Sequence, residues 1–163
     1  MNFIERLFTA LFILVLLIAY VMFCGFTTQY NLPFMHDGDT IYYYDSTTSK
    51  IIHGRLNNID CPELSQVYGV NSRDSVQYLL HNTNISIITT GIDKYNRDLV
   101  NVFIDNKPLD SIIIANGWGY VYLKYCKKKS LIITESIARS QKKGVWNLQP
   151  LQRPWDYRRH KRF

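Results

Sequence analysis

A stretch of nine residues, Arg55–Glu63, carries one guanidinium and two carboxylates in the order Arg-Leu-Asn-Asn-Ile-Asp-Cys-Pro-Glu. Pro62 cannot donate a hydrogen bond to a sheet and pushes Cys61 toward an extended conformation, so a strand here should end near Asp60. The extended stretch would span roughly 26 Å at about 3.3 Å per residue, so its two ends share a site only if the chain turns at the Cys-Pro step. Such a turn would gather groups for a cation and an anion. Taken alone, the stretch favours a surface loop over such a site.

Other charged positions extend this candidate chemistry. Asp39 lies in an Asp-Gly-Asp turn beside an expected strand, and Arg97 lies in a charged turn. A hard cation such as Ca²⁺ takes oxygen ligands, so Asp39, Asp60 and a main-chain carbonyl would suffice if water completes the shell. Glu63 is available as a ligand or a base, and Arg55 and Arg97 could each bind a phosphate with a bidentate fork. Phosphodiester hydrolysis needs such a base, metal and cations, but composition alone does not show that these residues converge.

The elements that must position these groups are many short strands and a few helices. Strand-like runs lie near residues 41–44, 50–59, 85–89, 99–104 and 118–125, separated by turn sequences. Apolar spacing and stop signals predict helices over 70–81, 109–116 and 130–143, with Ser130 as N-cap of the last and Gly144 as its stop. Residues 145–163 show little periodicity. This pattern predicts an α+β fold in which helices pack on a small β-barrel.

The N-terminal segment Leu7–Phe26 contains no charged residue. As a helix it would span roughly 30 Å, about the thickness of a bilayer's hydrocarbon core. It ends in Met-Phe-Cys-Gly-Phe, a poor cleavage site, which favours an uncleaved anchor over a signal peptide. We therefore predict a single-pass membrane protein with its domain on the non-cytosolic side, and a secreted protein with a removed leader is the alternative. The predicted organisation is an anchor or signal segment at 1–26, a linker at 27–35 and a domain at 36–163.

Charge is distributed unevenly along the chain. Residues 124–163 hold twelve Lys or Arg against two acidic residues, a net charge of +10, whereas residues 27–123 hold six against ten, a net charge of −4. The basic tail could attract nucleic acid, bind anionic lipid or simply be solvated, and the sequence leaves these readings open. The three cysteines form no metal-spaced pair, and a Cys61–Cys126 bridge has no support from spacing.

Several motifs in order resemble the thermonuclease, or staphylococcal nuclease-like, family over about residues 35–159. They are His36-Asp37-Gly38-Asp39-Thr40, Arg55–Glu63, Gln66-Val67-Tyr68-Gly69, Asp93-Lys94-Tyr95-Asn96-Arg97, Gly117-Trp118-Gly119-Tyr120-Val121, Lys143-Gly144-Val145-Trp146 and Pro154-Trp155-Asp156-Tyr157-Arg158-Arg159. The resemblance implies a five-stranded OB-type β-barrel with three helices, here preceded by the transmembrane helix. It also implies a Ca²⁺-dependent nuclease that cuts DNA and RNA and leaves 3′-phosphate and 5′-hydroxyl ends.

The resemblance also implies roles for individual residues. Asp39 and Asp60 would be carboxylate ligands of Ca²⁺, and Cys61 would contribute its main-chain carbonyl where the family archetype has Thr. Glu63 would be the general base or would position the attacking water. Arg55 and Arg97 would clamp the phosphate. Tyr125 falls near a nucleotide-contacting tyrosine of the family, whereas Leu123 stands where another tyrosine occurs. The implied partners are nucleic acid and the membrane, with no obligate protein partner.

A noncatalytic, membrane-tethered nucleic-acid-binding module on the same barrel is the alternative function. OB-type barrels often bind single strands through basic grooves and aromatic side chains. Loss of Asp39, Glu63 or Arg97 would favour that alternative, and all three are present. The sequence therefore favours the enzyme.

Overall fold

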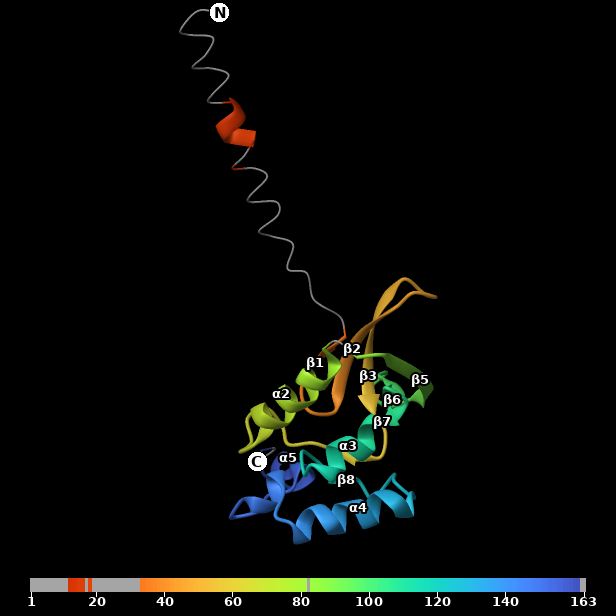
Figure 1. Cartoon of the computed structure of the whole chain (residues 1–163), viewed down its shortest axis with the longest axis vertical. Coiled ribbons are helices and arrows are strands. Elements are labelled where there is room, and N and C mark those ends of the chain that lie inside the picture. Colours follow the sequence, from red (N-terminus) through yellow and green to blue (C-terminus); the bar gives the residue numbers. More distant parts are fainter. Residues whose placement is uncertain (1–11, 17, 19–32, 82, 162–163) are drawn as a thin grey trace, which may run out of the picture. The chain divides into compact units, whose positions relative to one another are not determined.

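The structure of the protein is a computed structural model that describes residues 12–16, 18, 33–81 and 83–161. The chain forms two compact units, Met1–Asn31 and Leu32–Phe163. In the first unit, residues 12–16 and 18 are helical, and most of the predicted segment Leu7–Phe26 lies outside the described residues. The second unit contains all the described strands and the remaining described helices (Figure 1).

The predicted membrane localisation is contradicted. No helix within the described ranges is long and apolar enough to cross a membrane. Hydropathy reports the transfer free energy of side chains, but a span also needs about 20 residues of continuous helix. The described residues do not contain such a helix, so the prediction of an N-terminal transmembrane helix is not confirmed.

A curled, largely antiparallel sheet forms the scaffold of the second unit (Figure 1). Its strands lie in the order β1 (Phe34–Met35), β2 (Thr40–Asp45), β3 (Lys50–Leu56), β6 (Asp98–Ile104) and β5 (Ile85–Ile92), and β7 (Lys107–Pro108) pairs with β6. β3 and β6 are parallel, and the register of β5 against β6 shifts between Thr89 and Gly91. A register shift of this kind bends a strand and increases its twist. β4 (Ile59–Asp60) and β8 (Tyr120–Val121) form a separate two-stranded sheet.

The α+β class is confirmed, and the curled sheet with its helices fits the predicted OB-type fold, but details of the predicted barrel differ. Within the described residues, edge strands β1 and β5 do not pair with each other, so the strands do not form one closed five-stranded barrel. The aromatic run 118–125 forms a strand only at Tyr120–Val121. After it the chain turns, with the amides of Tyr125 and Cys126 donating to the carbonyl of Tyr122, which ends the ladder.

Four α-helices are described in this unit: α2 (Gly69–Leu80), α3 (Leu109–Ala115), α4 (Lys129–Ser140) and α5 (Pro154–His160). The first three confirm the predicted helices, although α4 begins one residue before Ser130 and has no side-chain N-cap. The fourth is an addition to the predicted three. A 3₁₀-helix, η1 (Gly144–Asn147), precedes it. In Figure 1, α3 lies between the sheet and α4, and it contacts both.

Two apolar clusters hold these layers together. The main cluster buries the inner faces of the sheet, α2 and α3, with Ile41, Val76, Val100 and Ile113 fully enclosed. The second cluster joins β8, α4 and η1 through Tyr120, Ala138, Val145 and Trp146. Trp155 of α5 packs against the second cluster, so the C-terminal segment is attached to the same sheet that carries Asp60.

Candidate functional site

The Asp37–Asp39 turn places the first predicted carboxylate. Asp37 Oδ1 accepts hydrogen bonds from the amides of Asp39 (3.0 Å) and Thr40 (2.7 Å), a local closure that Asp favours in turns. Gly38 packs so closely that a Cβ there would lie 2.2 Å from Ser72 Oγ and 2.7 Å from Cys61 Cβ. The turn therefore needs glycine at this position and holds Asp39 just before the first residue of β2.

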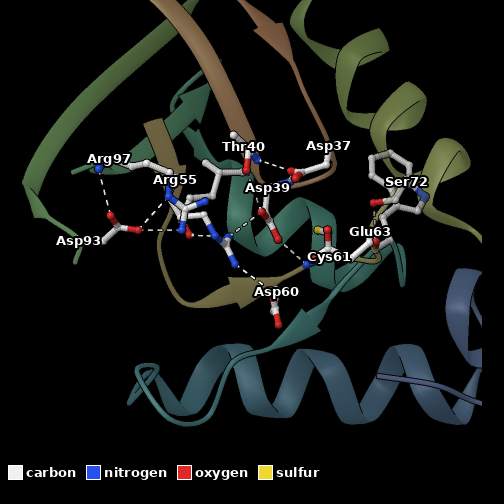
Figure 2. A network of polar contacts seen from close by, with 12 residues as sticks. Asp37, Asp39, Thr40, Arg55, Asp60, Cys61, Glu63, Ser72, Asp93 and Arg97 are labelled. Carbon is white, nitrogen blue, oxygen red and sulfur yellow. Dashed lines mark hydrogen bonds and ion pairs between the residues drawn. The ribbon is translucent and has the colours of Figure 1, made fainter. Parts of the chain in front are cut away.

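Arg55 lies between the two predicted carboxylate ligands. The β2–β3 register pairs Thr40 with Arg55, which brings Asp39 beside the end of β3. Arg55 Nη1 lies 2.8 Å from Asp39 Oδ1, and Arg55 Nη2 lies 2.8 Å from Asp60 Oδ1. The side chain of Asp60 is 1% exposed and that of Asp39 is 6% exposed. One guanidinium thus joins two buried carboxylates, one from the turn before β2 and one from β4 (Figure 2).

The residue after Asp60 contributes its backbone to this cluster. The Cys61 amide donates a hydrogen bond to Asp39 Oδ2, which ties the end of β4 to the Asp39 turn. The Cys61 thiol is buried, next to the positions where Gly38 and Gly119 lack a side chain. Both Cys61 and Cys126 are free. The thiol is therefore part of the core, and any ligand role for Cys61 belongs to its main-chain carbonyl, as the family resemblance implies.

Glu63 lies at the more exposed side of the cluster. Its amide donates to Gln66 Oε1 (2.9 Å), and its carbonyl accepts from the Gln66 amide (2.8 Å), which closes the loop after Pro62. Its side chain is 34% exposed, and Oε1 lies 2.7 Å from Nη1 of Arg158. Arg158 also contacts both oxygens of Asp60, with Nη2–Oδ2 at 2.7 Å and Nη1–Oδ1 at 3.2 Å.

Arg97 lies next to this cluster but pairs with a different acid. Because β3 and β6 are parallel and Asp98 lies opposite Gly54, Arg97, the residue just before β6, lies beside β3 close to Arg55. Its Nε and Nη2 lie 2.9 and 2.7 Å from Asp93 Oδ2. In Figure 2 the Asp93–Arg97 pair is on one side of Arg55, and Asp39 and Asp60 are on the other. The structure thus brings both predicted arginines to one region, but within the described ranges the ion-pair partner of Arg97 is Asp93 and not a predicted metal ligand.

Tyr125 is 62% exposed in the turn after β8. Its ring makes an edge contact with Tyr122, with centroids 5.1 Å apart, and Lys124 Nζ lies 5.5 Å from its ring centre. Tyr122 in turn stacks on Trp155 of α5. The predicted substrate-contacting residue therefore belongs to an aromatic patch with a neighbouring cation.

Burial dominates the electrostatics of the cluster. Desolvation raises the pKa of Asp39 well above its usual range, Arg55 opposes this rise, and nearby Asp37 and Asp60 add to it. Desolvation lowers the pKa of Arg55, but Asp39 and Asp60 outweigh it, so the net shift is upward. Desolvation also acts to lower the pKa of Arg158, and its hydrogen bonds to Asp60 and Glu63 raise it strongly overall. The cluster concentrates negative charge that requires cations.

The donor set fits a hard divalent cation but not a softer metal. Among the described residues, no three His, Cys, Asp or Glu side chains form a group that could hold a metal ion. Asp39 and Asp60 flank one guanidinium, and the nearby charge of Asp60 contributes to the raised pKa of Asp39. Two carboxylates completed by a main-chain carbonyl and water match Ca²⁺ rather than zinc, which prefers four nitrogen or sulfur ligands.

Arg158 is the member of this cluster that sequence reasoning missed, although it lies in one of the motifs that carry the family resemblance. Its helix has recognisable start and end signals: Pro154 at the first turn, Asp156 near the N-terminus and a basic last turn. Each of these is favoured at that end of a helix. The signals could have predicted the helix, but not its contact with residues almost one hundred positions earlier.

Comparisons with known proteins find similarity to a nuclease family and to proteins named as nucleases. Residues 53–148 match the family described as the staphylococcal nuclease homologues. The chain is 33% identical over 126 residues to an uncharacterized endonuclease of Escherichia coli O157:H7, covering 77% of this chain and 81% of that protein. It is 27% identical over 128 residues to an uncharacterized endonuclease of Haemophilus influenzae, covering 78% and 71%. It is 26% identical over 108 residues to the staphylococcal-like nuclease CAN1 of Arabidopsis thaliana, covering 66% and 33%.

Proposed function

This chain belongs to the family of staphylococcal nuclease homologues, and from this premise we propose that it is a Ca²⁺-dependent nuclease. Its substrates are the phosphodiester bonds of DNA and RNA, and its products carry 3′-phosphate and 5′-hydroxyl ends. The observation that supports this proposal most is the convergence of Asp39 and Asp60 on the Arg55 guanidinium at 2.8 Å each. The proposed catalytic domain comprises residues 36–163 together with β1 (Phe34–Met35), which the prediction placed in a linker at 27–35 but which pairs with β2.

Asp39, Asp60 and the main-chain carbonyl of Cys61 are the residues that would hold Ca²⁺. When bound, the ion supplies Lewis-acid polarisation of the phosphoryl oxygens. Burial of both carboxylates suits this role, because charge interactions are stronger where water is excluded.

The remaining groups act on water and on the phosphate. Glu63, which is half-buried beside Asp60, accepts the proton of the attacking water. The water oxygen forms a bond to phosphorus, the bond from phosphorus to the 5′ oxygen breaks, and a proton from solvent completes the 5′-hydroxyl. Arg55 and Arg97 stabilise the charge that develops on the phosphate. Tyr125 stacks against a base, since aromatic faces bind bases without sequence preference.

Digestion of plasmid DNA with and without a chelator tests this proposal. The purified full chain is incubated with supercoiled plasmid in Ca²⁺ buffer from pH 7 to 10, and a matched reaction contains excess EGTA. We expect cutting that EGTA abolishes and that added Ca²⁺ restores. Fragments should accept 5′ label from polynucleotide kinase without prior dephosphorylation. Absence of chelator-sensitive cutting throughout this pH range would refute the proposal.

A further inference from the structure

The C-terminal helix α5 brings a third arginine to the candidate site. Arg158 contacts Asp60 through two nitrogens and Glu63 through one, at distances between 2.7 and 3.2 Å. Its side chain is 37% exposed, compared with 12% for Arg55. The same guanidinium therefore bridges a proposed metal ligand and the proposed base from the open side of the cluster.

Specific contacts fix α5 in this place. Trp155 stacks on Tyr122 with centroids 5.5 Å apart and meets Tyr120 edge-on at 6.0 Å. Tyr157 donates from its hydroxyl to Ser65 Oγ at 2.8 Å. The side-chain amide of Gln66 donates to the carbonyl of Gln152 at 3.2 Å. The helix is thus seated on β8 and on the loop that carries Glu63.

The carboxylates of the cluster differ in how they depend on this helix. Asp39 is held by Arg55 and by the Cys61 amide, and Asp60 is held by Arg55 as well as Arg158. Glu63 has Arg158 as its only ion-pair partner within the part of the chain that the structure describes. Loss of Arg158 therefore leaves Asp39 and Asp60 paired but removes the contact that orients the Glu63 carboxylate.

We propose that Arg158 is a positioning residue, through which α5 holds the carboxylate of Glu63 in its working orientation. This inference rests on the proposed nuclease function and on Glu63 as its base. A guanidinium is suited to the task because its planar fork can contact two carboxylates at once with fixed geometry. A lysine has one charged centre, so Arg158→Lys should retain the charge and only part of the orientation.

A double-mutant cycle between positions 158 and 63 tests the inference. Full-length wild type, Arg158→Ala, Glu63→Gln and the double variant are compared by plasmid cutting in Ca²⁺ under saturating and limiting DNA. Arg159→Ala is the matched control, because Arg159 is on the same helix, is 72% exposed and approaches Asp156 only at 4.0 Å. Arg158→Lys and Arg158→Gln are made in parallel, and circular dichroism identifies which variants are folded.

We expect Arg158→Ala to lower kcat at least about tenfold with KM changed less than twofold, whereas Arg159→Ala leaves kcat unchanged. Arg158→Lys should recover part of the loss. In the Glu63→Gln background the Arg158→Ala change should have little further effect, because effects of groups that act through one another are not additive. A purely structural role would instead lower the rate of Glu63→Gln as much as that of wild type.

The same cycle is measured by urea unfolding in EGTA, which does not depend on activity. Arg158→Ala should lower the unfolding midpoint more in wild type than in Glu63→Gln. Equal shifts in both backgrounds would overturn the inference, as would a kcat of Arg158→Ala equal to or above that of wild type. Faster cutting together with tighter Ca²⁺ binding would identify α5 as an inhibitory plug instead. An inactive wild type would refute the nuclease proposal itself, whatever the unfolding cycle shows.

Discussion

Asp39 and Asp60 together present two buried negative charges to one buried guanidinium, that of Arg55. Removing one member of such a buried cluster typically costs about 3–5 kcal/mol, because the remaining charge stays desolvated. Arg158 supplies the second positive charge in this structure. Because Arg158 also pairs with Glu63, three carboxylates share two guanidiniums, and their oxygens are concentrated at one point, which is the property that a cation site needs.

Glu63 is the residue whose replacement separates catalysis from stability most cleanly. Glu63→Gln keeps the shape of the side chain but cannot accept a proton, so we expect turnover to fall at least about a hundredfold. Its carboxylate is 34% exposed, so the folded state should persist. Initial rates of plasmid cutting provide the measurement. Asp74→Asn, which alters an exposed carboxylate on α2, is the control and should cut at the wild-type rate. A near wild-type rate for Glu63→Gln would rule out the assigned role.

His53 gives the fold a predictable response to acid. Burial lowers the pKa of His53, and the nearby charges of Arg97 and His36 lower it further, against smaller opposing effects of Asp37 and Asp93. The unfolded chain therefore binds this proton at higher pH than the folded chain does. Stability should decrease as pH falls below about 6.5, the ordinary histidine value, toward the folded-state pKa.

Replacement of His53 by Phe tests this response. The ring of His53 stacks on Tyr42 with centroids 4.6 Å apart, and Phe can keep that stack. Urea unfolding at pH 7.5 and 5.5 should show a smaller loss of unfolding free energy for His53→Phe than for wild type. His160→Phe, on an exposed part of α5, is the control. An identical acid response in wild type and His53→Phe would contradict the prediction.

The sequence predicted which residue types the site uses better than it predicted their partners. Asp39, Asp60 and Arg55 converge as the nuclease hypothesis requires, whereas Arg97 pairs with Asp93 within its own turn. That local pair could be read from the spacing of four residues. The Arg158 contacts with Asp60 and Glu63 could not, because only the docking of α5 brings these residues together.

At the scale of elements, the start of α2 controls the position of the Glu63 loop. Tyr68 adopts a positive φ of 75° immediately before the helix, and the helix begins at Gly69. A Cβ on Gly69 would lie 1.9 Å from the main-chain oxygen of Glu63. The backbone of the loop and the first turn of the helix therefore touch directly, and a side chain cannot be inserted without moving one of them.

Gly69→Ala should accordingly displace the Glu63 loop. We expect a destabilisation of about 1–3 kcal/mol, the usual cost of overpacking, and at least a tenfold lower rate of cutting. Urea unfolding and the plasmid assay measure the two effects. Gly91→Ala on β5 is the matched control, since a Cβ there meets nothing within 4 Å. If Gly69→Ala matched Gly91→Ala in both assays, the close approach would have no functional weight.

Elements with strong local signals were predicted well, and those defined by tertiary contacts were not. Helix α2 follows from the spacing of Val76 and Leu80, both buried. Strand β8 has two residues because only Tyr120 and Val121 find a partner in β4. Helix α5 has seven residues and packs through Trp155 and Pro154, so its apolar pattern is too short to show periodicity.

At the scale of the whole molecule, the uneven distribution of charge along the sequence indicates a polyanionic partner such as nucleic acid. The membrane localisation predicted from hydropathy was wrong. The net charge of the chain is +6, and the excess lies after residue 123. A basic surface binds nucleic acid largely by releasing counterions from the phosphates, so affinity falls as salt rises. This dependence can be measured without any cutting.

The exposed lysines just before α4 and at its first residue should carry part of this interaction. Lys127 and Lys129 are exposed, whereas Lys128 forms an ion pair with Asp110 at 3.0 Å and is left unchanged. Binding of a short DNA duplex is measured in EGTA at several salt concentrations. We expect the slope of log Kd against log salt to become shallower by about 1.8 in the Lys127→Gln/Lys129→Gln variant. This is about 0.9 for each phosphate that no longer binds a lysine. Lys50→Gln, which removes an exposed charge at the β2–β3 hairpin, should leave the slope unchanged. Equal slopes for wild type and the double variant would place the nucleic acid on another surface, because a lysine that touches no phosphate releases no counterion.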